Sequence, residues 1–197
     1  MKSDEIIIKG NDVNIQSIIA EVNKVADYYK IDPKKSIRLQ LLAEELIGVE
    51  KGIMGYPTGV FYVETKNDEI MLCLSIESTV DYLAQEKFLE LSKSGKNEAT
   101  KGIGGKIRYI VNWMFSGCGT EYASTIDYEG VYSGLYSGHV PGTMYDMGWS
   151  LTKYRDNAQD DKDAWDELEM SIIGKLADDV LVGASNNKIE IKIITKM

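Results

Sequence analysis

The 197 residues are enough for one domain, or for one domain with an added segment, and 44% of them are hydrophobic, so the chain is able to bury a core. The formal net charge is −9, and a surface this acidic argues against binding to nucleic acid or to an anionic membrane. No apolar run approaches the ~20 residues that a membrane span requires.

Few residues are available for metal or nucleophile chemistry. The chain has one histidine, His139, and two cysteines, Cys73 and Cys118, without the spacing of a disulfide framework. Zinc sites built from histidine and cysteine, and catalytic dyads that need a second histidine, are therefore nearly excluded, and no metal ligand is predicted. Together with an N-terminal apolar run too short for a signal peptide, this usage predicts a cytoplasmic protein.

The first part of the chain predicts a strand, two helices and a hairpin, in that order. Residues 5–9 are β-branched, and residues 13–29 carry an apolar stripe at helical spacing. Asp32 and Pro33 are typical of a helix cap and a first helical position, so a second helix is expected to begin there. The strands 60–65 and 70–77 then form the hairpin.

The second helix is the most informative element, because two carboxylates interrupt an apolar pattern. Glu44 and Glu45 lie in its middle, away from either end. A carboxylate beside a buried stripe is costly unless it is paired, hydrated or used. Either both point along the solvent edge, or one lines a pocket and is a catalytic candidate. The apolar residues recur at steps of mostly three and four: Leu39, Leu42, Ala43, Leu46, Val49 and Ile53.

The middle of the chain is less regular. Ser78 and Asp81 predict a capping box and a helix to about residue 93, and another helix is expected from about residue 98. Glycine and tyrosine dominate from residue 117 to 148. The stretch 117–161 is interpreted either as an ordered excursion whose tyrosines pack on the body or as a mobile flap, and the acidic run 156–166 within and beyond it as a solvated linker.

The C-terminal part predicts one helix and a closing hairpin. Asp163 is expected to cap a helix that contains Leu168, Ile172, Ile173 and Leu176, and the strands 179–183 and 188–195 follow. Hairpins make antiparallel sheet, and amphipathic helices must cover one of its faces. The prediction is a single α+β domain over residues 1–197, a two-layer sandwich with a mixed, mostly antiparallel sheet covered on one face by helices.

Two segments and the order of the elements resemble a known superfamily. They are RLQLLAEELIGVEKGIMG, residues 38–55, and SIIGKLADDVLVGASNNKIEIKII, residues 171–194. They resemble the histidine-kinase-like ATPases, which include gyrase, heat-shock chaperones and histidine kinases, and among them the bacterial anti-sigma-factor serine kinases most closely. The resemblance implies that fold, ATP and magnesium as cofactors, a sigma factor or an anti-sigma antagonist as protein partner, and the possibility of a homodimer.

Three motifs of that family are altered in this sequence. Four residues after the family's glutamate stands an asparagine that holds magnesium, but Glu44 is followed at that distance by Gly48, and Glu45 by Val49. The family's Asp-x-Gly-x-Gly turn, whose aspartate binds the adenine amino group, is replaced by a segment beginning at Glu77, which is able to accept the same hydrogen bond. The triphosphate-wrapping glycines before the final helix are replaced by acidic residues 163–167, which repel phosphate.

A second phosphate candidate is the segment SGKNEATKGIGGKI, residues 94–107, which has lysines, glycines and a helix start. It matches neither a P-loop nor a dinucleotide-binding fingerprint. Its glycines, Gly102 and Gly104 among them, either let a helix pack closely or approach a phosphate. In the second case Lys96, Asn97 and Lys101 are the basic and polar residues that would hold the nucleotide.

Three functions follow as hypotheses. The first is a regulatory protein of anti-sigma type that acts by binding a protein partner, with nucleotide binding weakened or lost. The second is an active protein serine kinase that uses ATP and magnesium. The third is a small-ligand sensor that closes its tyrosine- and glycine-rich flap on an aromatic or sugar-like molecule.

Overall fold

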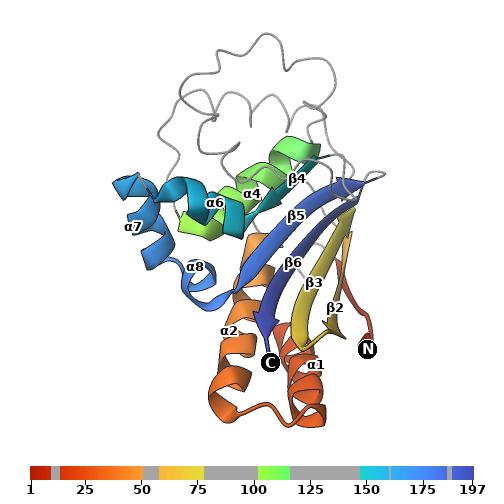
Figure 1. The fold of residues 1–197 in the computed structure, drawn as a ribbon. Coiled ribbons are helices and arrows are strands. Elements are labelled where there is room, and N and C mark those ends of the chain that lie inside the picture. The colour runs from red at the N-terminus through yellow and green to blue at the C-terminus, as the bar shows by residue number, and fades with distance from the viewer. Residues whose placement is uncertain (10–13, 51–57, 78–101, 116–146, 160, 186–187) are drawn as a thin grey trace.

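The computed structural model describes residues 1–9, 14–50, 58–77, 102–115, 147–159, 161–185 and 188–197. Figure 1 labels the larger elements along the chain. The elements are, in order, β1 (Ile6–Lys9), α1 (Ile15–Tyr28), α2 (Pro33–Glu50), β2 (Thr58–Lys66), β3 (Glu69–Glu77), α4 (Gly102–Phe115), β4 (Met147–Ser150), α6 (Leu151–Ala158), α7 (Lys162–Met170), α8 (Ile172–Leu176), β5 (Asp179–Ser185) and β6 (Lys188–Lys196).

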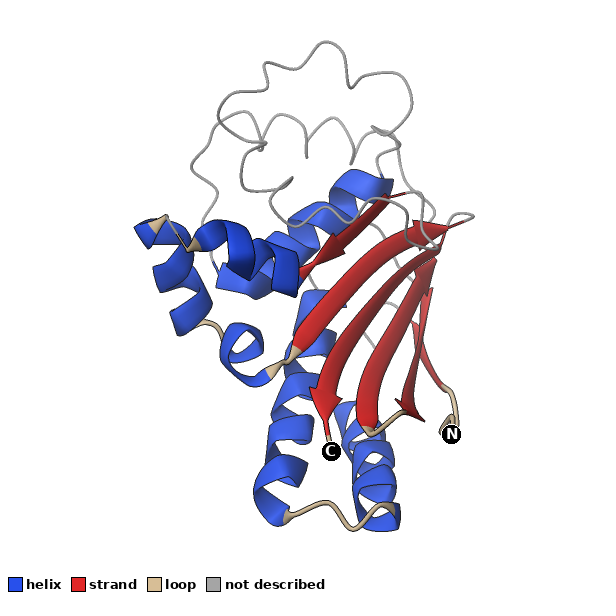
Figure 2. Ribbon diagram, in the orientation of Figure 1, coloured by secondary structure: helices blue, strands red, loops and turns tan. Residues whose placement is uncertain are grey.

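Six strands form one sheet in the order β1-β2-β3-β6-β5-β4 (Figure 2). Each neighbouring pair among the described strands is antiparallel, so the expected mixed sheet is corrected to an antiparallel one. The β2–β3 hairpin turns at Asn67 and Asp68, whose φ angles of 51° and 61° are those of a tight two-residue turn. The last hairpin pairs β5 with β6, as the sequence predicts.

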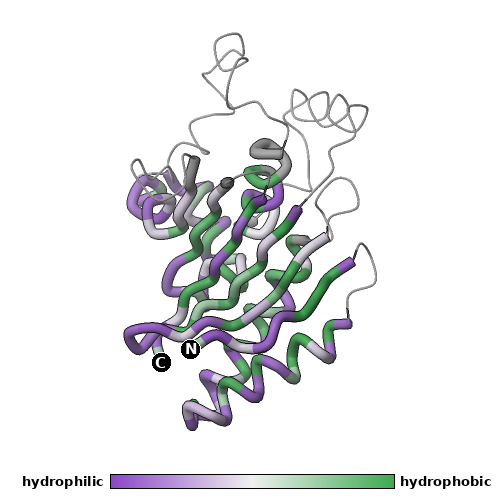
Figure 3. Tube along the Cα trace, turned by 90° about the vertical axis from the view of Figure 1, so that its right-hand side faces the viewer, coloured by the Kyte–Doolittle hydropathy of each residue, from purple (hydrophilic) through white to green (hydrophobic). Residues whose placement is uncertain are grey.

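Side chains alternate along each strand, so one face of the sheet is buried under the helices. The other face, called the open face below, carries mostly partly exposed side chains. Figure 3 shows this alternation of hydrophobic and hydrophilic residues. Helices pack on the buried face, so the α+β prediction is confirmed. The buried side chains of β2, β3 and β6 include Phe61, Val63, Ile70, Leu72, Leu74, Ile76, Ile189, Ile191 and Ile193.

The helix α2 lies in the middle of the helical layer. The Gln40 amide donates to Asn23 of α1 across 2.7 Å, and Arg38 donates to the Leu176 carbonyl of α8. The C-terminal part of α2 contacts α4, where Val49 is 2% exposed. Asp32 caps the start of α2, accepting from the Lys34 amide at 2.9 Å, as predicted.

The interpretation of residues 156–166 as a solvated linker is wrong for the residues described, because residues 156–158 belong to α6 and residues 162–166 to α7. Ser150 accepts from the Lys153 amide at 3.2 Å and caps α6. Leu151, Tyr154 and Ala158 then bury one side of this helix at helical spacing. Asp156 of α6 and Asp163 and Asp166 of α7 are exposed, so these charges of the acidic run lie on the solvated sides of two helices.

The prediction of a single helix before the last hairpin is also wrong, because the chain forms two helices there, α7 and α8. Ser171 is extended, with φ −91° and ψ 133°, and its hydroxyl caps α8 by accepting from the Gly174 amide at 3.2 Å. The helix α7 begins after Asp161 rather than at Asp163. Because the Ser171 hydroxyl accepts from an amide at the start of α8, it ends one helix and begins another within an otherwise continuous apolar stripe.

Several expectations lie outside the described residues. These are the Ser78 and Asp81 capping box, the helix to about residue 93, and the tyrosine- and glycine-rich segments with His139. In the described part of the chain, no helix combines the length and apolar character that crossing a membrane requires.

Candidate functional site

The two carboxylates of α2 point in different directions. Glu44 is exposed, whereas Glu45 is partly buried. Glu45 lies one turn before Val49, so the two are on the same side of α2. A β-carbon built on Gly104 of α4 would lie 3.8 Å from the Val49 Cγ2 atom. Of the two predicted catalytic residues, Glu45 is therefore the less exposed one, and it shares a side of α2 with Val49, which packs near α4.

The positions where the resembling family holds magnesium carry no ligand in this chain. Gly48, four residues after Glu44, has no side chain, and a β-carbon added to it would meet nothing within 4 Å. Val49, four residues after Glu45, is an apolar side chain packed in the core. Among the described residues no group of three or more histidine, cysteine, aspartate or glutamate side chains is arranged to bind a metal ion.

The first turn of α4 lies beside the last turns of α2. Gly102 begins it with a φ of +73°, a conformation that favours glycine. The amide groups of a helix start have no intrahelical acceptor and carry partial positive charge, so this turn is able to attract an anion. The structure thus brings Gly104 beside Val49, one helical turn after Glu45, where α2 meets α4. Lys96, Asn97 and Lys101 lie outside the described residues.

Lys106, one turn into α4, is engaged by the body of the protein. Its Nζ atom lies 2.8 Å from the Glu167 Oε2 atom of α7 and 5.1 Å from the ring centre of Tyr154. Burial would lower the pKa of Lys106, but the contacts with Glu167 and Tyr154 together outweigh it, so the pKa is above its ordinary value. This ammonium joins α4, α6 and α7, an arrangement that no sequence spacing indicates.

Glu77, the predicted adenine-binding residue, lies on the open face of the sheet. It follows the buried Ile76, so its side chain is on the side away from α2. Its Oε1 atom pairs with the Lys188 Nζ atom at 2.6 Å, on the neighbouring strand β6. The structure therefore does not bring Glu77 together with Glu45.

Cys73 is a buried thiol in the middle of β3. It is 1% exposed, and burial raises the pKa of Cys73 to about 12. The nucleophilic form of cysteine is the thiolate, which this residue does not reach at neutral pH. Cys73 is a packing residue, in keeping with its place in an apolar strand.

Alanine substitutions at the two glycines are expected to have opposite effects on stability. Gly102→Ala introduces a side chain at a positive φ and should lower the free energy of unfolding by about 1 kcal/mol. Gly104→Ala meets only an ordinary contact and should raise it by about 0.5 kcal/mol, because alanine favours helix. Urea unfolding of both variants is the measurement, and equal effects would contradict the geometry of this helix start.

Compared with protein-family models, with curated proteins and with solved structures, the chain has no match in any of the three.

Proposed function

We propose that this protein is a regulatory protein with the histidine-kinase-like ATPase fold, of anti-sigma type, that acts by binding a protein partner and has weakened or lost nucleotide binding. The fold assignment is supported by the element order and by the packing of α2 against α1, α4 and α8 on the covered face of the sheet. A helix placed elsewhere would have removed the basis of the resemblance.

The observation that carries the proposal is Val49. It occupies the position, four residues after Glu45, where the resembling family has its magnesium-holding asparagine, and it is 2% exposed in the core. A buried valine neither coordinates magnesium nor leaves space for it. With Glu77 paired to Lys188 on the opposite face, two of the three nucleotide contacts of the family have no equivalent beside Glu45.

Calorimetric titration with ATP and ADP, with and without magnesium, tests the loss of nucleotide chemistry. We expect no magnesium-dependent binding. Glu45→Gln probes the junction with α4, and Glu44→Gln, one residue away on the exposed side, is the matched control. Micromolar, magnesium-dependent ATP binding that disappears in Glu45→Gln and persists in Glu44→Gln would overturn this part of the proposal in favour of an active serine kinase.

The proposed binding to a protein partner is tested separately, by titrating the protein with purified sigma factors and anti-sigma antagonists of its source organism. Saturable binding that does not require nucleotide is the expected result. Failure to bind any of them, with the protein folded, would contradict the anti-sigma assignment even if nucleotide binding were absent.

A further inference from the structure

The outer side of α2 carries a second regular stripe. Its positions are spaced by three and four residues in alternation, as the a and d positions of a heptad repeat are, and on this helix they face away from the sheet. Two apolar side chains in it are unusually open, Ile37 at 57% exposed and Leu41 at 38%. The stripe consists of Lys34, Ile37, Leu41, Glu44 and Gly48.

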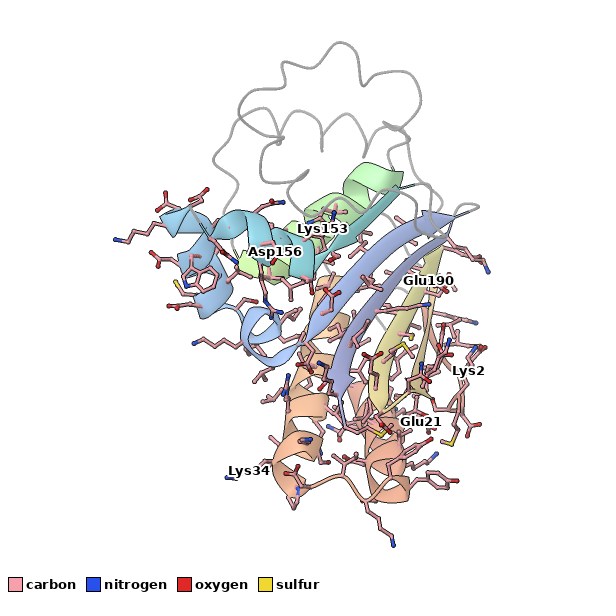
Figure 4. The ribbon with its side chains drawn as sticks, in the orientation of Figure 1. Lys2, Glu21, Lys34, Lys153, Asp156 and Glu190 are labelled. Carbon is pink, nitrogen blue, oxygen red and sulfur yellow. The ribbon has the colours of Figure 1, made fainter. Side chains whose placement is uncertain are left out.

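Nothing in the described part of the protein covers this stripe. All five residues are exposed, and neither Lys34 nor Glu44 forms an ion pair within the described residues. Figure 4 shows Lys34 near the outer end of α2 with its side chain pointing away from the body. Two exposed apolar side chains at a and d spacing, flanked by one residue of each charge, form a surface on which another helix is able to pack.

The charges in the stripe specify which helix fits. Lys34 and Glu44 lie five residues on either side of Leu39, and Ile37 and Leu41 lie two residues on either side of it. In an antiparallel contact with a two-fold axis at the level of Leu39, Lys34 of one copy meets Glu44 of the other, twice. Ile37 of each copy then meets Leu41 of the other, as a meets d in an antiparallel pair.

We propose that this stripe is a self-association surface, on which α2 of a second copy of the chain packs antiparallel. The contact is short: eleven residues of helix, from Lys34 to Glu44, span about 15 Å. Such a small interface makes a weak, reversible dimer rather than an obligate one. The net charge of −9 per copy opposes association, but distant charges are screened beyond about 8 Å at physiological salt, whereas facing pairs are not.

The surface is tested with charge-reversed variants in sedimentation equilibrium. In Lys34→Glu alone both facing pairs become two carboxylates, and in Glu44→Lys alone they become two ammonium groups. Each variant should dimerise about tenfold more weakly than the original chain. Mixed together, the two variants should form a heterodimer, because each of its two facing pairs then joins a carboxylate of one copy to an ammonium group of the other. The double variant should regain the original affinity.

Two controls separate the stripe from general charge effects. Lys35→Glu makes the same charge change in the same turn but off the stripe, and should leave the dimer unchanged. Leu41→Asp should prevent association alone and in every mixture. A chain that stays monomeric up to millimolar concentration, or a dimer that ignores Lys34→Glu, would overturn the proposal. Neither outcome depends on whether the protein binds nucleotide or a sigma factor.

Discussion

Leu42→Ala is expected to lower the free energy of unfolding by about 3 kcal/mol, and Leu41→Ala by less than about 1 kcal/mol. The two leucines are neighbours in sequence on the same helix, but Leu42 is fully buried and Leu41 is 38% exposed. Removing buried methyl groups costs their transfer free energy and leaves a cavity, since the packed surroundings close only in part. Leu41 is already partly exposed to solvent, so truncating its side chain loses less transfer free energy and leaves no enclosed cavity.

Urea unfolding followed by circular dichroism measures both values. The protein should be studied at low micromolar concentration, so that association through the outer stripe of α2 does not add to the apparent stability. Glu45→Gln serves as a further reference on the same helix and should be close to neutral for stability. Equal losses at Leu41 and Leu42 would mean that α2 is not seated on the core as described.

Arg155→Met is expected to lower the free energy of unfolding by about 2 kcal/mol. The guanidinium of this α6 residue donates to the carbonyls of Gly174, Ala177 and Asp178 at 2.7, 2.9 and 2.8 Å. Because the last carbonyls of a helix have no intrahelical donor, Arg155 satisfies the end of the short helix α8 and its link to β5. Methionine keeps the aliphatic stem and removes every donor.

The matched control for Arg155 is Lys153→Met, which removes an exposed cation from the same helix and should change stability by less than about 0.5 kcal/mol. Arg155→Lys should be intermediate, since one ammonium does not span three carbonyls as a planar guanidinium does. Thermal unfolding of the three variants gives the ranking. A neutral Arg155→Met would show that water replaces the arginine at these carbonyls without loss.

The spacing of apolar residues was sufficient to predict which side chains of β3 and of α2 are buried. A period of two in residues 70–77 sorted Ile70, Leu72, Leu74 and Ile76 onto one face, and all four are buried. Leu39, Leu42 and Leu46 were placed on the core by their helical period in the same way. Both results depend only on where a side chain points along its own element, which is a local property of the backbone.

The C-terminal helices show where local pattern fails. Leu168, Ile172, Ile173 and Leu176 fit one continuous stripe, yet Ser171 divides them. At Gly174 a β-carbon would lie 2.4 Å from the Leu168 carbonyl oxygen, so the close approach of the two helices requires glycine. Whether a serine caps a new helix or lies within a continuous one depends on how the neighbouring elements pack around it, and the sequence pattern does not show that packing.

For the candidate site, too, some features follow from the sequence pattern and others only from the tertiary structure. The sequence by itself determined that this chain has an α+β core and a central helix with two adjacent carboxylates, because the period of the apolar residues is sufficient for both. Only the tertiary structure decided that Glu45 is partly buried while Glu44 is exposed, that Glu77 pairs with Lys188 on the far face, and that Lys106 pairs with Glu167. These contacts join residues distant in the chain, and their geometry is set by packing.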